Sequence, residues 1–484
     1  MRSFPVLIGS IIASAGLAVS PSYAQVKNDE AGQLLEVIEV QQRRLDEQER
    51  EIASQKRAQQ QLRRQVEALQ QKSAPIATSA NTVVLTPDEG SELKALLERE
   101  ARELEVDWPG SFDVYGSKTR FKISGFAELD VSHDNHAIGS PTAFVTAAIA
   151  TRDGTPSEGS DGITHFSVQT SRLAVETRTP VGKHQLSTFI SLDFFGQFFS
   201  ANADPRIRQA YGEVSDILFG GDLLLGQAWS TLTYLPSFPN TLDFEGPPAS
   251  VATRRAMVRW TKELRRCLIL KLALEDPVGR DFTTAPVEDI VDSFDELSSA
   301  SEWPDVVAAL AWETDQVRIE GGIVSRDLRA SVNDEGTISE SAWGANFSGR
   351  INMPWSNQED FLTFGYVLGD GFGGLLNDSP PDAVYDFESN TLDTITARGG
   401  WLGFQHWWNP NFYSVVTHGQ LRVDNYEFQR PEAYRRAKYN SANLVWTPFP
   451  KWLFGFEALY GSRRDLDGRR GSVTRFQFTS RLSF

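Results

Sequence analysis

The stretch DLLLGQAWSTLTYLPSFPNTLDFEGPPASVATRRAMVRW covers Asp222–Trp260, and its character changes twice along its length. We predict short strands over Asp222–Ala228 and Thr253–Trp260. The segment between them holds four prolines and Gly246, so it cannot be regular structure. A solvated linker would not carry so many large apolar residues, which are Trp229, Tyr234, Leu235, Phe238, Leu242 and Phe244. We therefore predict a functional loop that folds against a wall.

The composition sets limits on the whole chain. Its 484 residues are 40% hydrophobic and 11% aromatic, which is enough to build a large folded core. The net charge of −17 argues against a nucleic-acid partner. A single cysteine, Cys267, excludes an intramolecular disulfide and a cysteine metal cluster. The six histidines show no metal-ligand spacing, so we expect neither a metal nor a cofactor.

The N-terminus has the parts of a secretory signal peptide. Arg2 precedes an apolar run over 4–19, and residues 22–24 (SYA) form a small-x-small cleavage site. The run is short for a bilayer, so we predict a removed signal peptide over 1–24 and a mature chain that starts at Gln25. Beyond it, no stretch approaches the roughly 20 apolar residues of a spanning helix. A membrane location would therefore require a closed β-barrel.

Residues 25–72 are rich in Glu, Gln, Arg and Leu and repeat with a period of seven. Pairing of Arg44 with Glu49 of a neighbouring helix favours a parallel, in-register coiled coil. Isoleucine at position a allows a trimer, whereas glutamines at position d leave the number of helices open. The alternative is a single charged helix. Residues 73–120 have the composition of a linker that contains a short helix over Ser91–Glu105.

From Phe121 onward, apolar and polar residues alternate with a period of two. In the last segment, Phe476, Phe478, Leu482 and Phe484 alternate with Arg475, Gln477, Thr479 and Arg481. A soluble β-sandwich would alternate in the same way, with its apolar face packed and its charged face solvated. The alternation alone therefore leaves two fold classes open.

Three further features favour a membrane barrel. Aromatic residues gather near strand ends, for example at Trp407-Trp408. Short connections such as 313–315 alternate with long ones such as 371–390. The chain stops on Phe484 at the end of an alternating strand, which resembles the recognition signal that bacterial outer-membrane barrels present to their assembly machinery.

Residues 121–484 number 364, and at about 22 residues per strand with its connection they provide about 16 antiparallel strands. We predict an all-β transmembrane barrel over 121–484, preceded by the α-helical coiled coil. A barrel of this width is not filled by its own side chains and encloses water. The loop 229–252 then has a lumen to enter, where we predict that it narrows the pore.

Several segments resemble the DcaP-like porins of Gram-negative outer membranes. They are FKISGF at 121–126, RIRQAYG at 206–212, LLGQAWST at 224–231, TLDFEGP at 241–247 and Arg254-Arg255. The resemblance extends in order over nearly the whole mature chain. It implies a homotrimer of 16-stranded barrels embedded in outer-membrane lipid, with the coiled coil in the periplasm. It also implies passage of small anionic solutes such as dicarboxylates.

Selectivity in a pore depends on its radius and on the charged side chains that line it. With the apolar face outward, alternation directs five arginines of strands near the loop into the lumen: Arg172, Arg206, Arg208, Arg255 and Arg259. Guanidinium groups in a narrow aqueous passage would attract carboxylates and phosphates and bind them bidentately. The alternative is that each arginine pairs with a loop acid such as Asp243 or Glu245 and holds the loop against the wall.

The constriction loop contributes Trp229, Ser230, Tyr234, Asp243, Phe244 and Glu245 to the predicted site. Trp229, Tyr234 and Phe238 would suit an aromatic track for sugars, but we favour packing of the loop itself. We interpret His406, next to Trp407-Trp408, as part of an interfacial aromatic girdle rather than as a metal ligand.

Two other functions stay open at this point. One is a lipid hydrolase built on a barrel, but the sequence holds neither G-x-S-x-G nor H-E-x-x-H, and we assign no catalytic residue. The other is a structural tether, in which the barrel only anchors the N-terminal helices. Ion conduction would distinguish a channel from a tether, and ester hydrolysis would identify an enzyme.

Overall fold

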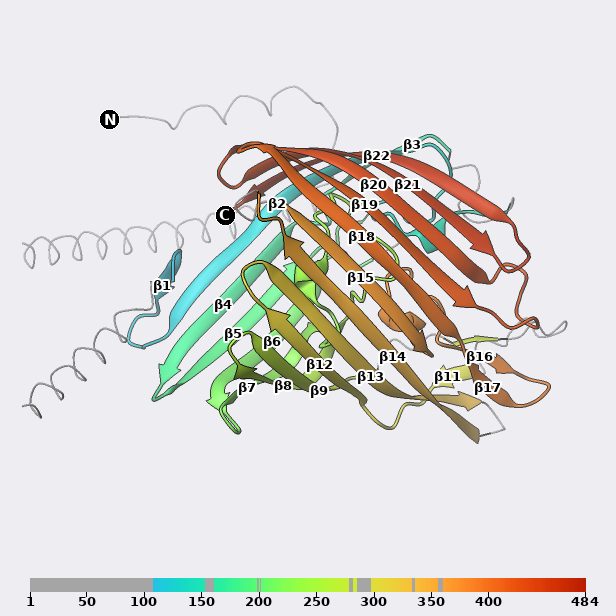
Figure 1. Ribbon diagram of the computed structural model, residues 1–484, viewed down its shortest axis with the longest axis horizontal. Coiled ribbons are helices and arrows are strands. Elements are labelled where there is room, and N and C mark those ends of the chain that lie inside the picture. The colour runs from blue at the N-terminus through green and yellow to red at the C-terminus, as the bar shows by residue number, and fades with distance from the viewer. Residues whose placement is uncertain are drawn as a thin grey trace, which may run out of the picture. The chain divides into compact units, whose positions relative to one another are not determined.

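The computed structural model describes residues 108–152, 161–197, 200, 202–277, 282–284, 297–332, 336–355 and 360–484. Its main feature is one antiparallel sheet of nineteen strands that closes on itself (Figure 1). The predicted signal peptide, coiled coil and helix over 91–105 lie outside the described residues. Within them, no helix has the length and apolar character needed to cross a membrane.

Three of the nineteen strands are short additions, and the other sixteen form the barrel in the described part of the chain. The barrel strands are β2 (Arg120–Asp134), β4 (Arg172–Val181), β5 (His184–Asp193), β6 (Arg206–Ile217), β7 (Gly221–Trp229), β8 (Arg254–Arg265), β9 (Leu268–Glu275), β12 (Asp305–Glu313), β13 (Val317–Val332), β14 (Gly336–Asn352), β15 (Phe361–Asp370), β18 (Thr396–Asn409), β19 (Phe412–Asp424), β20 (Tyr434–Phe449), β21 (Trp452–Asp465) and β22 (Arg470–Ser483).

The barrel closes between its first and last long strands. β2 pairs with β22 from Phe126 opposite Ser483 to Asp134 opposite Arg475. The other edge of β2 pairs with β4 and, further along, with β3 (Ile163–Ser167). Neighbouring barrel strands are antiparallel throughout. The barrel of 16 antiparallel strands predicted from the sequence is therefore confirmed.

The remaining elements are short. β1 (Ser111–Asp113) pairs with the start of β2, in a region that we predicted to be linker, and β11 (Leu297–Ser299) pairs with β13. A separate sheet joins β10 (Phe282–Thr284), β16 (Ala383–Asp386) and β17 (Thr391–Thr394). The 3-10 helices are η1 (Thr146–Ala148), η2 (Leu235–Ser237) and η4 (Gly373–Leu375).

The exposure of the barrel side chains decides between the two fold classes. On β22, Phe476 and Phe478 are 47% and 41% exposed, whereas the alternating Gln477 and Thr479 are 2% and 0% exposed. A soluble sandwich would bury the phenylalanines and expose the polar residues. The apolar face therefore points away from the protein, as in a barrel surrounded by lipid.

The lumen, which we predicted to enclose water and to receive the loop 229–252, is partly filled by packed apolar side chains. Leu232 and Val251 of the loop between β7 and β8, and Leu376 of the loop between β15 and β18, pack on inward-facing Val324 and Val367 in one buried cluster. The long connection predicted over 371–390 contains η4 and β16, and β17 follows it directly. These two loops fill one side of the lumen.

The two ends of the barrel differ in the length of their connections. Two-residue turns such as 182–183, 266–267 and 450–451 lie at one end, together with the end of β22. Long connections such as 230–253 and 371–395 lie at the other end. In outer-membrane barrels the short turns are periplasmic and the long loops external, which orients the chain.

Candidate functional site: an arginine-lined cavity

The loop 230–253, between β7 and β8, crosses the inside of the barrel. At its start, Ser230 Oγ donates a hydrogen bond to Glu275 of β9 (2.8 Å). Near its middle, the backbone N–H groups of Leu242 and Asp243 donate to Glu457 Oε2 of β21 (2.8 and 2.9 Å). In the order of the sixteen strands, β9 and β21 are eight positions apart in either direction. The loop is therefore tied to opposite walls.

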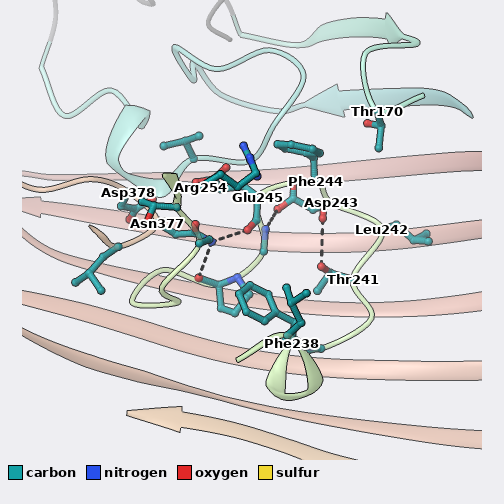
Figure 2. Close-up of a pocket in the computed structure, with 18 of the residues that line it drawn as sticks. Thr170, Phe238, Thr241, Leu242, Asp243, Phe244, Glu245, Arg254, Asn377 and Asp378 are labelled. Carbon is teal, nitrogen blue, oxygen red and sulfur yellow. Dashed lines mark hydrogen bonds between the residues drawn. The ribbon is translucent and has the colours of Figure 1, made fainter. Parts of the chain in front are cut away.

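A cavity of about 1020 Å³ lies beside this loop. Its walls come from the loop itself, from inward-facing residues of β4, β6, β8 and β22, and from two other external connections, at 145–148 and 376–379. Figure 2 shows the loop residues crossing in front of the barrel strands, with Glu245, Arg254 and Asp378 gathered at one side of the cavity.

Five arginines line the cavity: Arg172, Arg206, Arg208, Arg254 and Arg481. Arg206 and Arg208 share one wall carboxylate, that of Asp193, with N–O distances of 2.8 and 2.6 Å. Arg481 pairs with Glu128 of β2. The cationic side chains of this cavity thus outnumber the wall acids that pair with them.

Arg172 and Arg254 form no salt bridge with any acid in the described part of the chain. The guanidinium of Arg172 lies over the Phe126 ring at 5.3 Å, and that of Arg254 over the Trp229 ring at 4.7 Å. Aromatic faces stabilise a cation without cancelling its charge. These two arginines are therefore the ones best placed to attract an anion.

Arg208, which alternation predicts to point inward, lies at a β-bulge. Ser191 of β5 pairs with Gln209 and Leu192 pairs with Ile207, so Arg208 is an extra residue without an opposite partner. Such a bulge locally disrupts the pairing of the two strands. Arg208 contacts the faces of both Trp229 (5.6 Å) and Phe244 (5.5 Å).

Three acids of the external loops adjoin the arginines: Asp243, Glu245 and Asp378. The Asp243 carboxylate accepts hydrogen bonds from the backbone N–H groups of Phe144 and Gly246 (both 2.8 Å). Burial, together with the charges of Asp243 and Asp378, raises the pKa of Glu245 to about 8. Glu245 is therefore mostly uncharged at neutral pH, which leaves the positive charge of the cavity in excess.

The alternative role for the arginines, ion pairing with the loop, is not what the structure shows. Among the described residues, neither Asp243 nor Glu245 forms a salt bridge with an arginine. The partners of the paired arginines, Asp193 and Glu128, belong to the barrel wall. Hydrogen bonds to wall acids such as Glu457 hold the loop instead.

Two of the five predicted arginines do not line this cavity. Arg255 is buried and pairs with Asp305 of β12, which also accepts from Arg326 of β13. Arg259 contacts the backbone oxygen of Trp229 (3.4 Å). Both follow the predicted inward alternation, but the cavity ends before it reaches them. Their roles are therefore packing and ion pairing inside the wall.

Two arginines of the cavity, Arg481 and Arg254, were not predicted from the sequence. They differ in whether a sequence pattern could have identified them. Arg481 alternates with Gln477 and Thr479 on the inward face, so the same dyad rule identifies it. Its place beside the loop follows from barrel closure, because β22 lies far from the loop in sequence. Arg254 is the first residue of β8, where alternation places it on the outward face with Ala256 and Val258, so the dyad rule does not identify it.

The predicted loop residues fall into two groups. Trp229, Asp243, Phe244 and Glu245 line the cavity. Ser230 and Tyr234 do not, since their hydroxyl groups donate to Glu275 and Glu313 of the wall (both 2.8 Å). Of the proposed aromatic track, Trp229 and Phe238 face the cavity, with their ring centroids 6.5 Å apart, and Tyr234 does not.

His406 and Phe484 lie near the turn end of the barrel. The His406 ring bonds to Asp360 (Nδ1–Oδ2 2.8 Å) and packs edge-on against exposed Trp408. The Phe484 N–H donates to the Gly125 carbonyl (3.0 Å), so the last residue is joined to β2. Within the described residues, no group of three His, Cys, Asp or Glu side chains has a metal-binding arrangement.

A family model described as DcaP outer membrane protein matches residues 93–484. The chain belongs to the DcaP outer membrane protein family. The resemblance found in the sequence is thus confirmed, and the barrel is of the outer-membrane channel type. No curated protein sequence matches the chain.

Two solved structures have a fold similar to that of this chain. The outer membrane channel DcaP of Acinetobacter baumannii superposes with a TM-score of 0.65 at 19% identity, covering 78% of this chain and 100% of that one. The anion-selective porin from Comamonas acidovorans has a TM-score of 0.50 at 10% identity, covering 76% and 100%. At such low identities these similarities concern the fold.

Proposed function

We propose that this DcaP-family protein is a passive outer-membrane channel that favours small anions, dicarboxylates among them. The observation that carries the proposal is the cavity beside the loop 230–253. Five arginines line it, and the two wall acids that pair with them leave Arg172 and Arg254 without an acidic partner among the described residues.

The mechanism is electrostatic and requires no chemical step. A narrow aqueous passage with low-dielectric walls focuses the field of its charges, so the anion concentration rises inside it. Guanidinium groups on different strands would offer a planar carboxylate two parallel hydrogen bonds. Because the guanidinium groups belong to different strands, an anion would move from one arginine to the next rather than remain bound at one of them. We propose no enzymatic activity.

A planar-bilayer recording of the full chain under a salt gradient tests this function. We expect single-channel currents and a reversal potential whose sign shows that chloride passes more readily than potassium. A cation-selective reversal potential would overturn the role of the arginines. The absence of current from folded barrels would favour the tether, and hydrolysis of lipid esters would favour the enzyme.

We also propose that the barrel works as a homotrimer, with the coiled coil over 25–72 on the periplasmic side. The heptad repeat supports self-association. Removal of residues 27–72 should lower the temperature at which the trimer dissociates on detergent gels. A trimer of unchanged resistance would show that the barrel walls carry the association by themselves. We further propose that Phe484 is part of the signal for the barrel assembly machinery.

A further inference from the structure

The strands β18 to β22 lie side by side in the barrel wall (Figure 1). Each of them carries one arginine, and the five arginines form a continuous row. In the strand register, Arg398 lies opposite Arg422, Arg422 opposite Arg436, Arg436 opposite Arg464, and Arg464 opposite Arg470. All five side chains are exposed. They alternate with the buried inward-facing residues, so they project away from the lumen. We call these five residues the arginine row.

The charge of the arginine row is largely uncompensated. Like charges directly opposite one another on neighbouring strands destabilise a sheet. Arg398 and Arg422 share the carboxylate of Asp424, at 3.2 and 3.1 Å. The other three members form no salt bridge with an acid in the described part of the chain. Five positive charges that share one carboxylate predict that the row binds an anion from outside the protein.

The row lies near the long-loop end of the barrel, above the apolar band. Six residues closer to the turn end on the same strands, the outward-facing positions are Phe404, Val416, Ala442, Ala458 and Phe476. Six residues span about 20 Å along a strand, or about 14 Å along the barrel axis at a tilt of about 45°. This separation places the guanidinium groups at the level of lipid headgroups when the apolar row lies in the hydrocarbon.

A recess of about 540 Å³ opens directly below three members of the row. Arg398, Arg422 and Arg436 form its rim on the side of the long loops. Tyr366 and Leu402 contribute apolar surface on the side of the hydrocarbon, next to the polar side chains of His418 and Gln420. Gly400, between Arg398 and Leu402, has no side chain to fill the space. The recess therefore joins a cationic rim to a floor that is apolar in part, which matches a molecule with a phosphorylated head and acyl chains.

We propose that the arginine row binds the phosphate groups of a glycolipid in the outer leaflet of the outer membrane. Lipid there carries phosphorylated sugars, whereas free phosphate would not use the apolar floor of the recess. Arginine is suited to this task because its planar fork binds phosphate bidentately and keeps its charge. Strands about 4.8 Å apart give a row of about 19 Å, which is long enough for more than one phosphate group. The proposal is independent of the solute that crosses the lumen.

The experiment uses the full-length protein in a nonionic detergent, titrated with bisphosphorylated lipid A and observed by native mass spectrometry. The test variant is the triple substitution Arg436→Gln, Arg464→Gln and Arg470→Gln, which removes the members without an acidic partner. We expect lipid A to bind about a hundredfold more weakly to this variant, at about fivefold per arginine. The control variant Arg265→Gln, Arg266→Gln and Lys451→Gln removes three charges from the turn end and should bind as the wild type does.

Two ligand controls complete the test. Lipid A without its phosphates should bind at least tenfold more weakly to the wild type, and inorganic phosphate should not compete at millimolar concentration. Equal binding of the dephosphorylated lipid, or of the triple variant, would overturn the proposal. Effective competition by inorganic phosphate would also overturn it, in favour of a soluble-anion site. Unchanged single-channel conductance of the triple variant shows that its barrel is folded.

Discussion

The lumen contains two groups of arginines that belong to the same kind of inward-facing position but have different surroundings. On the packed side, Arg326 contacts Asp305 (3.2 Å) and Asp382 (2.8 Å), and all three are buried. On the cavity side, Arg172 and Arg254 lie over aromatic rings and have no acidic partner in the described residues. An inward-facing arginine thus becomes structural where acids match it and available to solutes where they do not.

The same contrast holds for the apolar side chains. On the packed side, loops cover Val324 and Val367 with Leu232 and Leu376, so water is displaced from that part of the lumen. On the cavity side, Trp229 and Phe238 line open space and contact cations or other rings. The passage proposed for anions is therefore confined to the cavity side of the lumen, and four predictions test this division.

The largest expected effect is on stability, from Arg326→Met. This change leaves the carboxylates of Asp305 and Asp382 buried with one fewer partner, which should lower the free energy of unfolding by about 3–5 kcal/mol. The matched change on the cavity side, Arg254→Met, should cost less than about 1 kcal/mol. Denaturant titrations of both variants in the same detergent measure the difference. If both variants lost the same free energy of unfolding, the packed side and the cavity side of the lumen would not differ in the way described.

A second substitution, Glu457→Ala, breaks the attachment of the loop to β21. The N–H groups of Leu242 and Asp243 would lose their shared acceptor, at a cost of about 2 kcal/mol. The released loop should also increase the single-channel conductance, because it crosses the lumen. Glu457→Gln keeps an acceptor oxygen and should change both quantities less. If conductance stays at the wild-type value in Glu457→Ala, the loop does not limit the passage.

The third prediction concerns selectivity. The double variant Arg172→Gln and Arg254→Gln should reduce the chloride-to-potassium permeability ratio by about fivefold per charge, since one charge at a few ångström contributes about 1 kcal/mol in water. The effect should diminish as ionic strength rises. Arg266→Gln, on a turn outside the lumen, is the control of equal charge. An equal decrease of the chloride-to-potassium permeability ratio in this control would show that the cavity arginines do not determine selectivity.

The smallest expected effect is a pH dependence that arises from Glu245. Its pKa of about 8 lies above the ordinary value for glutamate, so the proton is retained at neutral pH and lost as the pH rises through about 8. The new negative charge, beside Asp243, Asp378 and Arg254, should lower the anion permeability about twofold between pH 7 and 9. Glu245→Gln should flatten this dependence. An unchanged pH profile in that variant would assign the titration to another group.

Much of the fold follows from local sequence, because side chains on a strand alternate between two faces. Phe476 and Gln477 already indicate which face meets lipid, once strand length and connection length favour a barrel. Alternation also predicts that Arg208 points inward, but it does not reveal that Arg208 is the extra residue of a bulge between Ser191 and Leu192. Alternation along β22 also predicts that Arg481 points inward, but in the sequence Arg481 lies more than 200 residues after the loop that it faces.

The sequence by itself determined that the chain forms a membrane β-barrel, how many strands the barrel has, to which family it belongs and which loop enters the lumen. These properties are encoded in periodicity, proline content and local motifs that depend on neighbours in the chain. Only the tertiary structure decided which arginines meet acids and which remain exposed to solutes, because Asp193, Asp305 and Asp382 reach them through strand order and loop packing. It also aligned the five arginines of the outer row, since their opposition depends on the register of β18–β22, to which each strand contributes only one residue.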